Sequence, residues 1–101
     1  AMTFNLKDDA DGTAHFAVAE VSLSLNTQDD DYAEKSTQIS GETGKEALIK
    51  EIVADTLLTY TYAEVKTKDG QEELKDEILE KVQELFDSDF IIAVNISANY
   101  Q

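Results

Sequence analysis

The chain has 101 residues, which is enough for one small domain that buries roughly two-thirds of its unfolded surface. Its formal net charge is −14, from 22 acidic residues, eight lysines and no arginine, so it lacks the clustered cations that bind phosphate backbones or anionic membranes. An acidic surface of this kind usually serves solubility, and a basic protein partner is the alternative.

The chain has no cysteine, so disulfides and thiolate metal sites are excluded and the redox compartment stays open. No apolar run approaches the roughly 20 residues that span a bilayer, and no signal peptide is recognisable. Ala1 precedes Met2, which an ordinary translation start does not give, so residues 1–2 are interpreted as a cloning scar. We therefore expect residues 3–101 to be a single domain taken from a longer protein.

The first part of the chain predicts a β-hairpin. Residues 3–7 form a short strand, residues 8–12 its turn and residues 14–26 a long strand. The dipeptide Asp11-Gly12 between two extended runs is a hairpin signal, because glycine supplies the positive φ of a tight primed turn.

The apolar side chains of the long strand change phase along its length. In the first half the apolar residues are at even positions, Phe16 and Val18. In the second half they are at odd positions, Val21, Leu23 and Leu25. One face collects all of them only if Ala19-Glu20 forms a bulge. The alternative is a strand whose first half is covered on both faces.

Two acidic runs are candidates for a metal site. Residues 7–12 resemble a calcium loop with glycine at its sixth position, but Lys7 occupies the first ligand position and Val18 the twelfth, where an acid is required. The run Asp29-Asp30-Asp31 lacks the carbonyl ligands and rigid frame of such a site. We interpret the first run as a turn and the second as a solvated loop, and predict no metal site.

Residues 27–44 are polar and predict a long loop with a helical turn near residues 32–35. Loops of this length are often functional or mobile. The single histidine, His15, has no glutamate three or four residues away on a shared face, so a structural or surface role is favoured over catalysis. No serine or threonine has an identifiable base, and a small hydrolase or metal-dependent enzyme is the least favoured class.

An amphipathic helix is predicted over residues 47–61. Thr43 with Glu46 suits a capping box, and Glu46 with Lys50 forms an i, i+4 pair worth about 0.3 kcal/mol. The apolar stripe at helical spacing is Leu48, Ile49, Ile52, Val53, Thr56, Leu57 and Tyr60.

In the link at residues 60–68, Tyr60 and Tyr62 could form an exposed aromatic pair for a protein interface. The simpler interpretation is that Tyr60 completes the stripe and Tyr62 caps the sheet edge.

A second amphipathic helix is predicted to begin at Thr67, the favoured N-cap over Asp69, and to run to Phe86. Its apolar stripe is Leu74, Ile78, Val82, Leu85 and Phe86, with Leu79 beside it. Its solvent face carries Glu73, Asp76, Glu77, Glu80, Lys81 and Glu84. The stripe requires a partner layer, and the acidic face is interpreted as solvated.

Residues 88–101 alternate between apolar and mixed positions, which predicts a strand with one buried face. The predicted buried face is Phe90, Ile92, Val94, Ile96, Ala98 and Tyr100. The whole pattern predicts an α+β domain of β-β-α-α-β order, with a small antiparallel sheet and both helices packed on one face.

Residues 57–78 resemble the core of the flagellar basal-body protein FliL family. The matching features are Leu57-Leu58, the threonine-rich link at Tyr60-Thr61, Thr67 followed by Gly70, and Leu74-Lys75 before an amphipathic helix. The resemblance covers nearly the whole chain and implies a stomatin-like (SPFH-like) fold. Three positions depart from the family pattern: the long segment at residues 27–44, Gln83, and residues 96–99.

The resemblance implies a non-enzymatic flagellar motor accessory domain. Such a domain associates with itself into a ring-like oligomer and supports the stator units, which promotes flagellar rotation and motility. The resemblance also implies one membrane-spanning anchor upstream, with this domain on the outer side of the bacterial cytoplasmic membrane. We expect no catalytic residues, cofactor, metal or nucleic-acid partner. The alternative is a generic α+β adaptor or small-ligand-binding module of a membrane-anchored bacterial protein.

Overall fold

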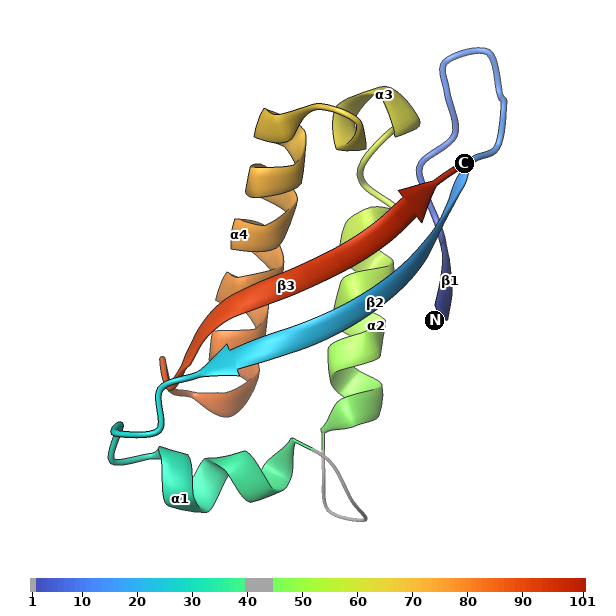
Figure 1. Ribbon diagram of the computed structural model, residues 1–101. Helices are drawn as coiled ribbons and strands as arrows, with labels where there is room; N and C mark the ends of the chain where they lie inside the picture. The colour runs from blue at the N-terminus through green and yellow to red at the C-terminus, as the bar shows by residue number, and fades with distance from the viewer. Residues whose placement is uncertain (1, 40–44) are drawn as a thin grey trace.

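The computed structural model describes residues 2–39 and 45–101 and is an α+β structure (Figure 1). In chain order its elements are β1 (Met2–Asn5), β2 (Phe16–Leu25), α1 (Tyr32–Lys35), the 3₁₀ turn η1 (Ser36–Gln38), α2 (Glu46–Leu57), α3 (Tyr62–Val65), α4 (Lys68–Phe86) and β3 (Ile91–Tyr100). The three strands form one antiparallel sheet in the order β1-β2-β3. In Figure 1 the helices α2 and α4 lie behind this sheet, on one of its faces.

The antiparallel sheet and the two long helices on one face confirm the main prediction. The predicted β-β-α-α-β order was incomplete, because the short helices α1 and α3 are added to it. The helical turn expected at residues 32–35 is present as α1, and η1 follows it directly. The predicted cap Thr43 lies outside the described residues.

Neither of the two arrangements predicted for β2, a bulge at Ala19-Glu20 or a first half covered on both faces, is present. Pairing with β3 is continuous from Ala17 to Ser24, so no bulge occurs at Ala19-Glu20. The inward face continues through Ala17 and Ala19, which are buried, while Phe16 is 39 % exposed. The prediction failed because the inward-facing residues of this half of β2 are small alanines. The large side chain at this point of the core comes from β1, where Phe4 pairs with Ala17 and is buried.

The bulge lies in β3 instead. Leu25 pairs with Ile91 and Ser24 with Ala93, which leaves Ile92 unpaired. Ile91 is buried and Ile92 is 55 % exposed, so the prediction that Ile92 joins the buried face was wrong. An extra residue shifts the two-residue alternation by one position. Beyond the bulge the predicted inward face is confirmed, from Val94 to Tyr100.

Helix α2 is shorter than predicted and ends at Leu57. The Thr59 hydroxyl donates to the Thr56 carbonyl at 2.7 Å, and Thr61 is extended because its hydroxyl caps α3. Threonine side chains that bond the local backbone compete with helix continuation in this way. Ile49, Val53, Thr56 and Leu57 are buried as predicted, but Leu48 is exposed and lies outside the core stripe. The predicted Glu46–Lys50 pair is formed at 3.3 Å.

Helix α4 supplies the longest buried stripe. Its buried side chains include Leu74, Ile78, Val82 and Phe86, as predicted, while Leu79 and Leu85 are half-buried against the core. Two lysines from earlier in the chain cap the C-terminus of α4 by donating hydrogen bonds to its last carbonyl groups. Lys35 donates to the carbonyl of Phe86 at 2.7 Å, and Lys45 donates to the carbonyl of Leu85 at 3.0 Å. Cations at this end also complement the helix dipole, so Lys35 and Lys45 are held at the C-terminus of α4.

The N-cap of α4 is Thr67, as predicted, and it joins two helices. Its hydroxyl accepts from the Gly70 N–H at 3.0 Å and donates to the Glu64 carbonyl of the α3 segment at 2.8 Å. We expect Thr67→Ala to lower the free energy of unfolding by about 1 kcal/mol, measured by urea denaturation. Thr67→Ser keeps the oxygen and is the matched control. Equal losses in the two variants would contradict a role for the cap.

Candidate functional site

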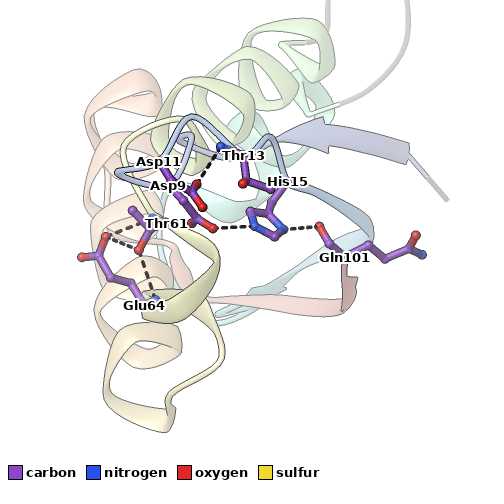
Figure 2. Close-up of polar contacts among 7 residues, drawn as sticks. All are labelled: Asp9, Asp11, Thr13, His15, Thr61, Glu64 and Gln101. Atoms are coloured by element: carbon purple, nitrogen blue, oxygen red, sulfur yellow. Dashed lines mark hydrogen bonds and ion pairs between the residues drawn. The ribbon is translucent and has the colours of Figure 1, made fainter.

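One end of the molecule brings together three segments that are distant in sequence: the loop between β1 and β2, the α3 segment, and the C-terminal residue (Figure 2). Lys7 forms a parallel bridge with Thr61, and its N–H donates to the Tyr60 carbonyl at 2.9 Å. Phe16 and Gln101 exchange two backbone hydrogen bonds, of 3.0 and 2.8 Å. We call this end the junction, defined by Asp9, His15, Tyr62, Lys66 and Gln101.

His15 is the centre of the junction. Its Nε2 lies 2.8 Å from the Asp9 Oδ2 and its Nδ1 lies 3.1 Å from the Gln101 carbonyl oxygen (Figure 2). Both neighbours are acceptors, and only the protonated imidazolium donates from both nitrogens. The hydrogen bond to Asp9 is the main cause that raises the pKa of His15, and the Gln101 carbonyl adds to it. Both ring nitrogens are engaged, which supports a structural role over a catalytic one.

Aromatic stacking extends the junction onto α3. The Tyr62 ring stacks on His15 with a centroid distance of 4.5 Å and an interplanar angle of 13°. The Lys66 ammonium lies 4.7 Å from the centroid of the same ring. Tyr62 therefore packs on His15, the residue directly before β2. Its half-buried ring, together with the exposed Lys66 beside it, leaves an accessible surface at this end.

Tyr60 completes the core stripe of the first long helix, as the simpler interpretation predicted. It is 6 % exposed, and its hydroxyl donates to Glu77 on α4 at 3.0 Å. Burial, reinforced by Glu77, raises the pKa of Tyr60 to about 12. The alternative of an exposed Tyr60–Tyr62 pair is excluded, because Tyr60 is buried in the core.

The acidic runs are used within the chain. At the turn, Gly12 has a φ of +86°, and Asp11 accepts from the Thr13 N–H at 2.9 Å. Hydrogen bonding from the Thr13 side chain, reinforced by this N–H, lowers the Asp11 pKa. In the second run, Asp29 accepts from the Asp31 N–H, and Asp31 accepts from the Ser88 hydroxyl. Within residues 2–39 and 45–101, no group of three or more His, Cys, Asp or Glu side chains is placed to hold a metal ion.

His15 gives the stability of the junction a pH dependence. Because the folded-state pKa is raised, this contribution is fully present below the unfolded value of about 6.5 and is lost as pH rises through the folded value. The wild type should therefore lose unfolding free energy relative to His15→Gln as pH rises from about 6.5 through the raised folded-state pKa of His15. Urea denaturation of both proteins across this range measures the difference. A difference that does not change with pH would contradict the prediction.

The α4 helix presents an acidic surface to solvent. Its carboxylates line an open, shallow surface formed by Asp69, Glu72, Glu73, Asp76, Glu77 and Glu80. Most of these side chains are exposed, as predicted, and Glu77 is half-buried where it accepts from Tyr60. This surface suits a basic partner.

Sequence reasoning missed an apolar groove between β2 and α2. Its volume is about 340 Å³. Its apolar lining includes Val21, Leu23 and Leu25 of β2 and Ile49 and Val53 of α2. The groove is open because β1 pairs only with residues 16–19 of β2, and the length of that pairing was not readable from the sequence pattern.

No helix among the described residues is long and apolar enough to cross a membrane. A comparison with protein families matches residues 1–97 to the family described as "Flagellar basal body-associated protein FliL". A comparison with curated proteins finds no match.

Proposed function

The chain belongs to the FliL family of flagellar basal body-associated proteins, and on this premise we propose that it is a non-enzymatic accessory domain of the flagellar motor. In this proposal the domain associates with other copies of itself and with the stator units, and so supports flagellar rotation. The observation that carries the proposal is the family match over residues 1–97. Family membership itself implies a function associated with the flagellar basal body and motility.

Two structural features support a binding role over a catalytic one. The ring nitrogens of His15, the single histidine, are both held by acceptors at 2.8 and 3.1 Å, so neither is free to take a proton from a substrate. Within the junction, His15 bonds to the Asp9 carboxylate and to the Gln101 backbone carbonyl, and Tyr62 contacts His15 and Lys66 through its ring. Such an arrangement stabilises a surface and provides no activated nucleophile.

The proposed arrangement places this domain outside the cytoplasmic membrane, on a single-pass anchor that precedes it. Confinement by an anchor raises the effective concentration of neighbouring domains, so weak contacts suffice for assembly. We assign the junction and the acidic surface of α4 as the parts of the domain that face partners. The fold assigned to such a ring-forming domain is the stomatin-like arrangement that the family resemblance implies.

A deletion strain tests the function. We expect cells that lack the full-length protein to swim more slowly, with the deficit growing in viscous medium, where each motor needs more engaged stators. Complementation with the full-length gene should restore swimming, and the tagged protein should co-purify stator subunits. A deletion strain that swims normally in both media, with no stator subunits recovered, would refute the proposal.

The apolar groove favours a second candidate function, a small-ligand-binding module. Its volume of about 340 Å³ lies at the lower end of ordinary ligand pockets. Thermal denaturation in the presence of fatty acids and other small apolar ligands tests this role. A midpoint that rises with ligand concentration, and that no longer does so in Val21→Lys, would support it.

A further inference from the structure

The apolar groove is a part of the sheet left without a covering strand. β1 ends its described pairing at Ala19, and residues 21–25 have no strand partner on the β1 side in the part of the chain that the structure describes. The side chains of Val21, Leu23 and Leu25 are only half-buried there. Apolar surface favours removal from water by about 25 cal/mol per Å², so this groove is suited to an apolar occupant.

Ile92 is an apolar side chain without a place in the core. At 55 % exposure it is the most exposed large hydrophobic side chain of the described residues. The β3 bulge holds it out of the ladder, and the adjacent Ile91 takes the buried position. Bulges recur where a strand re-aims a side chain, and they are treated as features of a fold instead of defects.

The groove and Ile92 lie on opposite edges of the same sheet. The strand order is β1-β2-β3, so β3 is an edge strand (Figure 1). The groove is lined by residues of β1, β2 and α2 and by none of β3, so it lies on the other side of β2. The two features therefore lie apart within one copy. A head-to-tail contact between copies joins two different surfaces of the same chain. Here one edge of the sheet has an apolar projection and the other edge has an apolar groove.

Opposite charges are present at the two features. Lys50 and Glu46 both line the groove and pair with each other at 3.3 Å, and Lys50 is about half exposed. The segment that leads into Ile92 carries the exposed carboxylates Asp87 and Asp89. In a chain of net charge −14, most approaches between two copies bring carboxylates together. An approach that brings Asp89 to Lys50 gains one attraction, which the neighbouring carboxylate of Glu46 partly offsets.

We propose that Ile92 of one copy seats in the apolar groove of the next copy. The contact is heterologous, so each copy supplies one projection and one groove, and a rotation that closes generates a ring. This inference rests on the proposed self-association and names the surfaces that carry it. Every interior copy of such an assembly has both surfaces covered.

Disulfide trapping tests the contact directly, because the chain has no cysteine of its own. Ile92→Cys and Glu46→Cys are made as separate full-length proteins, mixed in membranes and oxidised. Glu46 lines the groove, and its removal leaves Lys50 in place. We expect the mixture to give at least about tenfold more disulfide-linked dimer than a mixture of Leu58→Cys with Glu46→Cys, because seating raises the effective concentration of the two thiols. Leu58 is 48 % exposed and does not line the groove, so it is the matched control.

The double variant Ile92→Cys/Glu46→Cys should give a ladder of higher oligomers, whereas each single variant alone should give none. Circular dichroism checks that the variants fold, and sedimentation of the oxidised and reduced proteins measures their association. Oligomers without a link between positions 92 and 46 would overturn the inference and leave the proposed self-association standing. Monomers in both membranes and solution would refute both. The cysteine at position 46 is also tested with a thiol reagent. If it is protected although no disulfide forms between positions 92 and 46, another segment occupies the groove, and the inference is overturned.

Discussion

Replacing Gly70 by alanine is expected to lower the free energy of unfolding by about 3 kcal/mol or more. Gly70 is buried in the first turn of α4, and a Cβ built on it would lie 1.9 Å from the carbonyl oxygen of Glu64. The obstacle is backbone, held by the hydrogen bond between the Thr67 hydroxyl and the Glu64 carbonyl, so no side-chain rotation relieves it. Urea denaturation followed by circular dichroism measures the loss.

The sign of this effect distinguishes packing from helix propensity. Propensity alone predicts that alanine in place of a helical glycine stabilises by about 1 kcal/mol. Gly12→Ala is the matched control, since no atom lies within 4 Å of its added Cβ and only the positive φ of 86° is unfavourable. That variant should lose about 1 kcal/mol. A Gly70→Ala protein as stable as the wild type would contradict the close approach of α3 to α4.

Phe90→Ala is expected to cost about 3–5 kcal/mol, a large part of the stability of a domain of this size. The Phe90 side chain is fully buried and packs edge-on against Phe86, with ring centroids 5.7 Å apart. Its carbonyl accepts from the Asn26 N–H at 2.7 Å, so the residue joins the end of α4, the end of β2 and the start of β3.

Phe16→Ala is the control for this prediction, because it deletes the same ring from the open face of the sheet, where the side chain is 39 % exposed. We expect it to cost less than about 1 kcal/mol. Thermal and urea unfolding of both variants compare a buried ring with an exposed one. Equal costs would contradict the assignment of the inward face of the sheet.

The long helix α4 was predictable because its apolar residues repeat at the helical period from Leu74 to Phe86 and because Thr67 supplies a recognisable N-cap. The end of α2 was not, because it depends on threonine hydroxyls that bond the local backbone. The bulge at Ile92 could not be predicted from the sequence either. Ile91 and Ile92 are identical residues, and only the register against β2 decides which of them is buried.

The candidate site was predictable only in outline. The link before α4 was singled out from the sequence, but the pairing of His15 with Asp9 was not, because it depends on a loop that folds back across the turn at Gly12. The contacts of His15 with Gln101 and Tyr62 join positions far apart in the sequence. Such contacts leave no spacing signal in the chain. A histidine near an Asp-Gly turn was the one available indication.

In-cell photo-crosslinking of the full-length protein tests the central claim most directly. Photoreactive residues replace Tyr62 at the junction and Glu80 on the acidic surface of α4, and crosslinked partners are identified after purification. The account predicts recovery of further copies of the protein and of stator subunits. Recovery of neither, from a protein that folds normally, would contradict the motor role and favour an adaptor or ligand-binding domain.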